Sequence, residues 1–345
     1  MRMGVRHSPA GGPSVRTPDD FGQRLEQSRN VAVGKVCEVC DVMSLPREIL
    51  PGRFYKITRR TVQRMFLLRP DAETNNAFLY CLGVAAKRCG VEVLLPCVMS
   101  NHHHTEIYDR KGTVVEFVEH LHKLMARSQN VLRGRSENMW SSEEVSIVQL
   151  VDPADVIDKL VYTATNPVKD GLVEKVHHWP GVNGFSDLVN QRTIRAKRPR
   201  HFFREDGPMP AEITLELTIP PELGEAAEVL AVLRERVAAF EESKRLERLK
   251  TGRSVLGRRR VLRQSPFASP TTESPRREIR PRVAARSRGS RIEALLRNRV
   301  FIDRYRAARV AWLAGASVEF PPGTYWLRRF AGVTVAPDTR STFKT

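Results

Sequence analysis

The chain of 345 residues lacks any apolar run of membrane-spanning length and contains only five cysteines. The first absence argues against a transmembrane protein. Cys81, Cys89 and Cys97 lie in apolar stretches, so we interpret the cysteines as reduced core residues of a cytosolic protein rather than as disulfide partners. The N-terminus is basic but has no apolar segment behind it, which is not the pattern of a secretory signal. We therefore expect a cytoplasmic protein without a membrane contact.

Acidic residues are also scarce relative to basic ones. The chain has 39 Asp and Glu against 57 Lys and Arg, which gives a formal net charge of +18. Such an excess is unusual for a cytosolic enzyme of small molecules and favours a polyanionic partner, nucleic acid before an anionic membrane surface. Because any single basic run is more often a solvated tail, this inference depends on the net charge of the whole chain.

Composition divides the chain into three parts. Residues 1–45 are rich in Gly, Pro, Ser and charge without a sustained period, which predicts a mobile segment. Residues 46–190 have the length and patterning of one ordinary domain. Residues 191–345 form a basic extension with predicted helices at about 224–250 and 291–313. The Ser-, Pro- and Arg-rich stretch between these helices is expected to be disordered until it binds something acidic.

The pattern within residues 46–190 alternates between strand and helix. Strand-like runs cover 53–58, 91–98, 101–108 and 145–150. Three helices are predicted to begin at Asp71, at a Thr113/Glu116 capping box and at Asp152-Pro153, and to end at Gly90, Gly134 and Asn166-Pro167. The resulting order predicts an α+β fold, an antiparallel sheet with helices packed against it.

The run Met99-Ser100-Asn101-His102-His103-His104-Thr105-Glu106 follows an apolar strand. If it forms the next strand, His102 and His104 point the same way, with Cα atoms about 6.5–7 Å apart. Two imidazoles so placed can hold one divalent cation and leave positions for phosphate oxygens and water. A His-x-His motif taken alone more often consists of histidines on a solvated strand edge than of metal ligands.

Tyr162 and Asn166 lie four residues apart in the third predicted helix, so they share a face. Because a residue before proline resists helical geometry, we expect Asn166 at the frayed end of that helix. Together with His102 and His104, the pair would provide three neutral metal ligands and a hydroxyl nucleophile.

These two motifs together resemble a known family. Asn101-His102-x-His104 after an apolar strand, followed by Tyr162-x-x-x-Asn166-Pro-Val-Lys-x-Gly-Leu-Val on a helix, resembles the HUH single-tyrosine transposases of the insertion-sequence type, and among them the REP-associated tyrosine transposases. The resemblance covers roughly residues 45–190, and the paired motifs are specific where either alone would be weak. It implies a ferredoxin-like domain, often a homodimer, that cuts and rejoins single-stranded or hairpin DNA in the bacterial nucleoid.

The resemblance also implies roles for particular residues. His102, His104 and Asn166 would bind Mg²⁺ or Mn²⁺, and Tyr162 would be the nucleophile. A phenol ionises only near pH 10 and attacks poorly at neutral pH, and a metal on the scissile phosphate would make the phosphorus more electrophilic. Attack would leave a 5′-phosphotyrosine and a free 3′-hydroxyl, so that rejoining needs no ATP.

Two positions depart from the family pattern. His103 stands where the family usually has a bulky apolar residue, and Ser100 stands where proline is common. His103 is expected to point into the sheet packing, where it needs a hydrogen bond. These departures favour a rival function, a non-catalytic transposase-derived protein that recognises hairpin DNA.

Weaker predictions concern several other side chains. Glu106 shares the histidine face and is an additional metal ligand, a water-orienting group or a plain surface acid. Tyr108 is interpreted as a DNA-stacking or packing residue. The basic residues expected to contact phosphates are Arg59, Arg60, Arg64 and Lys169.

Two further sets of side chains have the chemistry of metal ligands. His120 and His122 also form His-x-His, but about 200° apart on a helix they cannot share one ion, so we interpret them as surface and packing residues. Cys37 and Cys40 form half of a zinc site without a second pair at finger spacing. They are the basis of a third alternative, a zinc-stabilised binding module.

Overall fold

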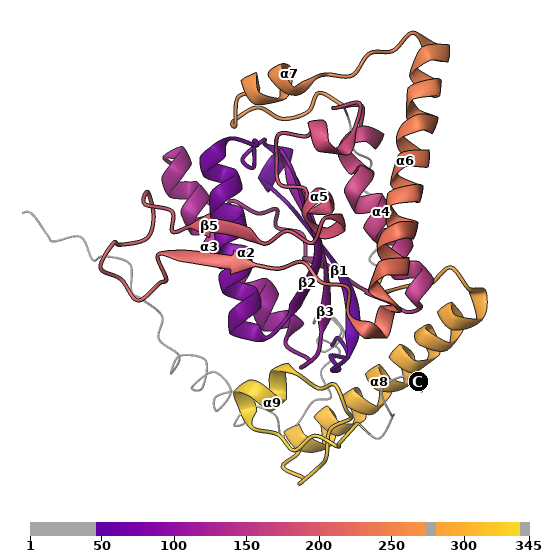
Figure 1. Cartoon of the computed structure of the whole chain (residues 1–345). Coiled ribbons are helices and arrows are strands. Elements are labelled where there is room, and N and C mark those ends of the chain that lie inside the picture. Colours follow the sequence, from indigo (N-terminus) through magenta and orange to yellow (C-terminus); the bar gives the residue numbers. More distant parts are fainter. Residues whose placement is uncertain (1–45, 273–280, 339–345) are drawn as a thin grey trace, which may run out of the picture.

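A five-stranded sheet forms the centre of the computed structural model, which describes residues 46–272 and 281–338 (Figure 1). The strands are β1 (Arg53–Arg60), β2 (Glu92–Met99), β3 (His102–Asp109), β4 (Ser146–Leu150) and β7 (Val283–Ala284), in the spatial order β2-β3-β1-β4-β7. The first four pair antiparallel, and β7 adds two residues parallel to β4. This order confirms the predicted α+β fold with a ferredoxin-like sheet. Cys37 and Cys40 lie outside the described residues.

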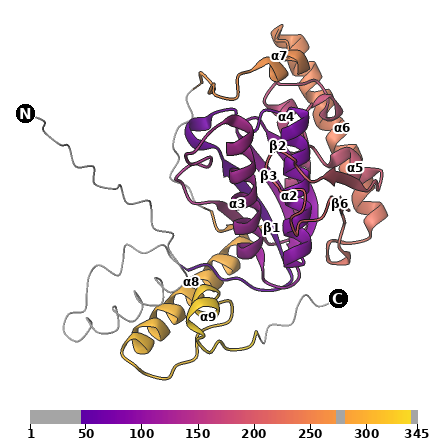
Figure 2. The same cartoon turned by 90° about the vertical axis from the view of Figure 1, so that its left-hand side faces the viewer.

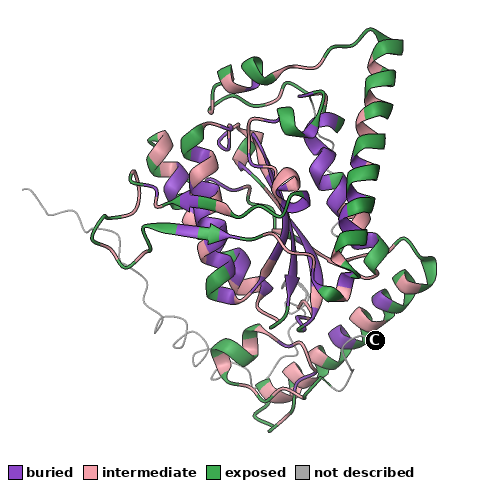
Figure 3. Ribbon diagram, in the orientation of Figure 1, coloured by how far each residue is buried: buried purple, intermediate pink, exposed green. Residues whose placement is uncertain are grey.

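Helices cover both faces of the sheet (Figure 2). One face packs against α2 (Ala72–Cys89) and α3 (Val114–Arg133), and the other against α4 (Pro153–Lys169), with α6 (Ala226–Thr251) along its outer side. Because side chains alternate along a strand, β3 sends Ile107 into the core under α2 and α3 and Tyr108 into the core under α4. Figure 3 shows the buried residues concentrated on the sheet and on the helix sides that face it.

The chain beyond residue 190 packs against this core. The remaining elements are α5 (Phe185–Val189), β5 (Ile194–Lys197), β6 (Glu212–Leu215), α7 (Arg258–Arg263), α8 (Arg288–Leu313), α9 (Trp326–Ala331) and the 3₁₀ turns Val62–Arg64, Val176–His178 and Pro221–Leu223. β5 and β6 form a hairpin that buries Ile213 and Leu215 against α2. α6 buries Val229, Leu233 and Val237, which the sequence predicts for its apolar stripe. None of the helices in the described residues is long and apolar enough to cross a lipid bilayer.

Two expectations for the C-terminal part need correction. The stretch 251–290 contains α7 and β7, whereas the sequence predicts it to be disordered; residues 273–280 lie outside the described ones. Val261 of α7 is fully buried, because this one apolar side chain enters the core beside α4. The helix at 291–313 is present as α8, and its spacing predicts an apolar stripe that includes Leu295 and Ile302. Ile302 is buried, but Leu295 is 50% exposed and Phe301 turns inward instead.

The helix signals around α2 are confirmed. The Asp71 carboxylate accepts a hydrogen bond from the Thr74 backbone N–H at 2.9 Å, which satisfies an amide that the helix itself leaves unpaired. Gly90 ends the helix in the left-handed conformation, at φ +66°. Gly134 ends α3 in the same way, at φ +62°.

The capping box predicted at the start of α3 does not form. Instead, the buried carboxylate of Asp109, at the end of β3, accepts from the backbone N–H groups of Thr113 and Val114, at 2.9 and 2.8 Å. Glu116, predicted as the reciprocal partner, forms an ion pair with Arg329. The Asp109 carboxylate at the end of β3 thus takes the place of the predicted Thr113/Glu116 capping box.

The predicted end of α4 at Asn166-Pro167 is also wrong. Pro167 lies inside the helix, which ends at Lys169, so Asn166 is a buried helical residue rather than a frayed end. Backbone hydrogen bonds continue on both sides of the proline: Asp170 N–H donates to the Asn166 carbonyl at 3.0 Å and Leu172 N–H to the Pro167 carbonyl at 2.9 Å. Tertiary packing therefore overrides the usual preference of a residue before proline.

His103 makes the hydrogen bonds that its buried position requires. Its Nε2 lies 2.9 Å from Nε2 of His122, and its Nδ1 lies 3.1 Å from Thr105 Oγ1. Burial lowers the pKa of His103 to about 3 and holds the pKa of His122 well below its usual range. The two rings are therefore neutral, one donating and one accepting, and His122 is a packing residue as predicted.

Folding stability should fall as the pH drops below about 6.5, because unfolded His122 takes up a proton that the folded protein excludes. The contribution of His122 to the free energy of unfolding is fully present above the pKa of the unfolded histidine. It is lost as the pH falls toward the much lower pKa in the folded protein. Per histidine, the free energy of unfolding changes by about 1.4 kcal/mol per pH unit. Urea titrations between pH 6.5 and 4.5 should show a flatter pH dependence for His122→Gln, by up to about 1.4 kcal/mol per pH unit. The exposed His177→Gln is the control, and an unchanged slope in His122→Gln would contradict the account.

Candidate active site

The register of β1 and β3 assembles a row of polar side chains on the face that α4 covers. Thr58 pairs with His104, and Lys56 pairs with Glu106. Because directly opposed residues of antiparallel strands point to the same face, these four side chains and His102 gather there. The rings of His102 and His104 lie 4.9 Å apart, centroid to centroid.

Asn101 determines which nitrogen of His102 carries the proton. Its Nδ2 donates to the carbonyl of Arg64 at 3.2 Å, so its Oδ1 is the atom that faces His102 Nδ1, at 2.7 Å. An amide oxygen only accepts, which requires a proton on Nδ1 and leaves the lone pair on Nε2. Histidines that bind metals are commonly oriented by such a contact through the other ring nitrogen.

His104 is held in a similar way by Thr58, whose Oγ1 lies 2.8 Å from His104 Nδ1. Burial lowers the pKa of His102 to about 3 and holds the pKa of His104 well below its usual range, and neighbouring cations act in the same direction. Both imidazoles are therefore neutral near pH 7, which is the form that binds a metal ion.

The helix α4 brings Asn166 and Tyr162 to the histidines. Asn166 is buried, and its Nδ2 lies 3.4 Å from His102 Nε2. The Tyr162 ring centroid lies 5.9 Å from that of His104, and the residue is 36% exposed. The structure thus brings together the four residues that the two motifs single out, with the phenol accessible to a large substrate.

Two lysines flank Tyr162. Lys169, two turns further along α4, donates from Nζ to the Tyr162 hydroxyl at 3.1 Å, and Lys56 Nζ lies 4.0 Å from the ring centroid. Sequence reasoning assigned Lys169 to phosphates and missed Lys56, whose position depends on how β1 pairs with β3. The available signal was the alternation along β1, which puts Lys56 and Thr58 on one face.

Glu106 is fully buried rather than a surface acid. Its Oε1 accepts from Thr163 Oγ1 at 2.6 Å and lies 3.7 Å from Lys56 Nζ, whereas its Oε2 has no hydrogen-bond partner among the described residues. Burial raises the pKa of Glu106 and lowers the pKa of Lys56. Because Thr163 follows Tyr162 on α4, this buried pair ties the helix to the sheet beside the phenol.

Removing the lysine alone should destabilise the fold. Lys56→Met leaves the Glu106 carboxylate buried without a cation, which should lower the free energy of unfolding by about 3–5 kcal/mol at neutral pH. The double variant Lys56→Met/Glu106→Gln should regain most of that loss, because a neutral amide can still accept from Thr163. Urea titrations of both variants test this, and a double variant no more stable than Lys56→Met would contradict it.

The donor set fits a divalent metal ion with open coordination positions. It consists of two neutral imidazoles, at least that of His102 with an unprotonated Nε2, and the side-chain oxygen of Asn166. Within residues 46–272 and 281–338, no group of three or more His, Cys, Asp and Glu side chains could hold a metal. The third protein ligand on this face would therefore be Asn166, and the buried unpartnered oxygen of Glu106 lies on the same face.

The basic residues predicted to contact phosphates separate into two groups. Arg60 is exposed at the end of β1, directly across from His102, and Lys169 adjoins Tyr162. Arg59 donates to backbone carbonyls of the 141–143 loop, so it supports the fold.

Arg64 and Tyr108 are engaged within the fold. Arg64 donates to the carbonyl of Thr272, and this hydrogen bond attaches the C-terminal part of the chain to the loop that follows β1. Tyr108 is 3% exposed and packs on Phe54, with ring centroids 4.6 Å apart, so it is a packing residue rather than a base-stacking one.

Comparisons with known proteins find likenesses among solved structures. No protein-family model matches the chain, and no curated protein matches it. The chain is similar to a REP-associated tyrosine transposase bound to a REP hairpin, with 18% identity and a TM-score of 0.37 over 44% of this chain and 87% of that one. It is also similar to a protein of Deinococcus radiodurans R1 assigned as a transposase, with 18% identity and a TM-score of 0.25 over 31% of this chain and 85% of that one. Matches at this level do not assign the chain to a family.

Proposed function

We propose that this chain is a DNA strand transferase that cuts and rejoins single-stranded DNA through a 5′-phosphotyrosine at Tyr162. The observation that carries the proposal is the placement of one accessible phenol beside two neutral imidazoles and a buried amide, with a lysine ammonium on its hydroxyl. A nucleophile, ligands for a divalent metal and a cation beside the attacking oxygen thus occur together.

The side chains of this site support each part of the reaction. Lys169 donates to the Tyr162 hydroxyl at 3.1 Å, which holds the attacking oxygen in place. The phenol gives its proton to solvent, the Oη–P bond forms as the P–O3′ bond breaks, and the released 3′-oxygen takes up a proton from solvent. His102, His104 and Asn166 would hold Mg²⁺ or Mn²⁺, which supplies neutralisation of phosphate charge. Because the phosphotyrosine is itself a phosphodiester, attack by a 3′-hydroxyl reverses the step without ATP.

The proposal extends to partners and place of action. The net charge of +18 and the exposed Arg60 beside the histidines fit a nucleic-acid substrate, single-stranded or hairpin DNA. A homodimer working on the bacterial nucleoid in the cytoplasm belongs to the same proposal, by resemblance to the family named above.

A covalent-trapping assay tests the reaction class. The protein is mixed with labelled single-stranded hairpin DNA, including the repeats that flank its gene, and with Mn²⁺ or Mg²⁺, then run on a denaturing gel. We expect a shifted, protease-sensitive band that requires the metal. Tight binding without this band, across several hairpins and both metals, would favour the non-catalytic hairpin-binding protein instead.

A further inference from the structure

A segment of the C-terminal part, residues 256–272, crosses from one side of the candidate active site to the other; we call it the strap. It begins next to the end of α4, where the backbone N–H groups of Leu256 and Gly257 donate to the carbonyls of Gly171 and Leu172, both at 2.9 Å. This is the helix end that carries Asn166 and Lys169. The strap therefore starts beside the residues that contact Tyr162 and His102.

The far end of the strap lies on the loop after β1. The Ala268 carbonyl accepts from the Phe66 N–H at 2.8 Å, and Ser269 Oγ donates to the Gln63 carbonyl at 2.8 Å. The same loop accepts the hydrogen bond of Asn101, the residue that orients His102. The two ends of the strap thus adjoin the two elements that build the site.

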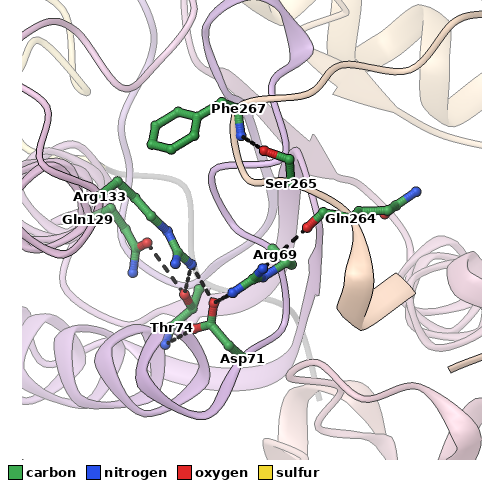
Figure 4. A network of polar contacts seen from close by, with 8 residues as sticks. All are labelled: Arg69, Asp71, Thr74, Gln129, Arg133, Gln264, Ser265 and Phe267. Carbon is green, nitrogen blue, oxygen red and sulfur yellow. Dashed lines mark hydrogen bonds and ion pairs between the residues drawn. The ribbon is translucent and has the colours of Figure 1, made fainter. Parts of the chain in front are cut away.

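The middle of the strap is fixed to the domain as well. Arg69 donates to the Gln264 carbonyl at 3.3 Å and is itself paired with Asp71 at 3.0 Å (Figure 4). Asp71 also pairs with Arg133 at 2.6 Å, and Val261 of α7 is fully buried. Because of these contacts, the strap is packed on the domain surface and is not a solvated tail.

The outer side of the strap carries cations and one aromatic ring. Arg258, Arg259, Arg260 and Arg263 are exposed, and within residues 46–272 and 281–338 no carboxylate forms an ion pair with them. On a helix whose Val261 points inward, Arg259 and Arg263 lie one turn apart and point outward. Phe267, a few residues on and beside the Arg69 network in Figure 4, is 52% exposed.

We propose that the strap is a binding surface for single-stranded DNA and holds the strand that reaches Tyr162, an inference that rests on the proposed function. Unpaired guanidinium groups in a row suit successive phosphates, and an exposed ring beside them suits an unstacked base. A duplex offers phosphates but no free base face, so the aromatic ring selects the single strand. The position of the strap ends, on α4 and on the loop that holds Asn101, directs such a strand toward the site.

The charge of the strap is tested by DNA binding in the full chain carrying Tyr162→Phe, so that no covalent product forms. The probe is a fluorescent 20-nucleotide single strand, with affinity followed from 0.05 to 0.5 M salt. Losing three phosphate contacts, in Arg259→Gln/Arg260→Gln/Arg263→Gln, should lower the salt slope by about 2 and weaken binding about 100-fold at 0.1 M salt.

A matched control removes the same charge elsewhere. Arg291, Arg299 and Arg304 are exposed on α8, at the opposite end of the molecule from α7 (Figures 1 and 2). Changing all three to Gln should alter affinity less than about threefold, since only long-range charge is lost. Equal losses in the two triple variants, or none in the strap variant, would overturn the proposal.

The aromatic part has a separate signature. Phe267→Ala should weaken single-strand binding about tenfold at every salt concentration without changing the salt slope, and should leave duplex binding unchanged. An equal loss for single strand and duplex would overturn the single-strand assignment. With Tyr162 restored, covalent capture at saturating DNA should survive in the strap variants. Loss of binding without any capture in the wild type would support the strap and reject the strand-transferase proposal.

Discussion

Tyr162→Phe should abolish covalent capture of DNA, by at least about 1,000-fold, while DNA binding survives. The substitution removes only the attacking oxygen. The ring can keep its place against His104, 5.9 Å between centroids, and beneath Lys56, 4.0 Å from Nζ to the centroid. The protease-sensitive band of the trapping assay is the measurement.

A matched tyrosine separates loss of the nucleophile from loss of a phenol in general. Tyr305 packs against Phe301 and Phe320, with centroids 6.0 and 5.6 Å apart, remote from the histidines in sequence and in the fold. Tyr305→Phe should capture DNA as the wild type does. A band that persists in Tyr162→Phe would mean that another side chain attacks the phosphate.

The double variant His102→Ala/His104→Ala should stop strand cleavage at every metal concentration. These two imidazoles are the nitrogen ligands proposed for the metal. Asn101, which the Arg64 carbonyl holds in place, keeps the proton of His102 on Nδ1 and its lone pair on Nε2. Without them, Asn166 alone cannot hold the ion against water, so saturation with Mn²⁺ should not restore activity. Calorimetric titration with Mn²⁺ in the absence of DNA gives a second readout, which should show binding in the wild type and none in the variant.

The control for this variant is a second pair of neighbouring histidines. His177 and His178 are both exposed, with rings 4.4 Å apart, and lie outside the site. Changing both to Ala should leave cleavage and Mn²⁺ binding intact. Cleavage recovered at high Mn²⁺ in His102→Ala/His104→Ala would show that these side chains are not the metal ligands.

Local periodicity was enough to predict the main parts of the site. Alternation along a strand puts His102 and His104 on one face, and the four-residue spacing on a helix does the same for Tyr162 and Asn166. Both relations hold within a single element and need no knowledge of its neighbours. The order of the elements predicts the antiparallel sheet with packed helices, whereas the ferredoxin-like arrangement was implied by the family resemblance.

Two features that sequence reasoning missed, the position of Lys56 and the burial of Glu106, depend on pairing between elements. Lys56 faces Tyr162 because β1 pairs with β3 in one particular register, and a shift of one residue would turn it to the other face. Glu106 is buried because that register and Thr163 of α4 both close over it. Alternation along β1 puts Lys56 and Thr58 on one face, but which residues of β3 and α4 they meet depends on the register.

The disorder predicted for 251–290 was wrong for the described residues 251–272 and 281–290, and for a different reason. Composition measures whether side chains can bury enough apolar surface, and this stretch has little. Backbone groups, however, bind any complementary edge: Leu256 and Gly257 use the carbonyls after α4, and Ala268 uses the N–H of Phe66. One buried residue, Val261, then suffices to fix the turn between them.

Backbone groups of the outer strand β2, and of the chain where β4 meets the short outer strand β7, are paired within the chain itself. On β2, Val98 N–H donates to the Val182 carbonyl at 2.8 Å; beside β4, Val151 N–H donates to the Ala284 carbonyl at 3.1 Å. Where such margins are open, a strand from a second molecule can add to the row, which leads to fibres or exchanged segments. Since these backbone groups are already paired within one chain, a second copy cannot add a strand at these positions and would have to meet them through side chains.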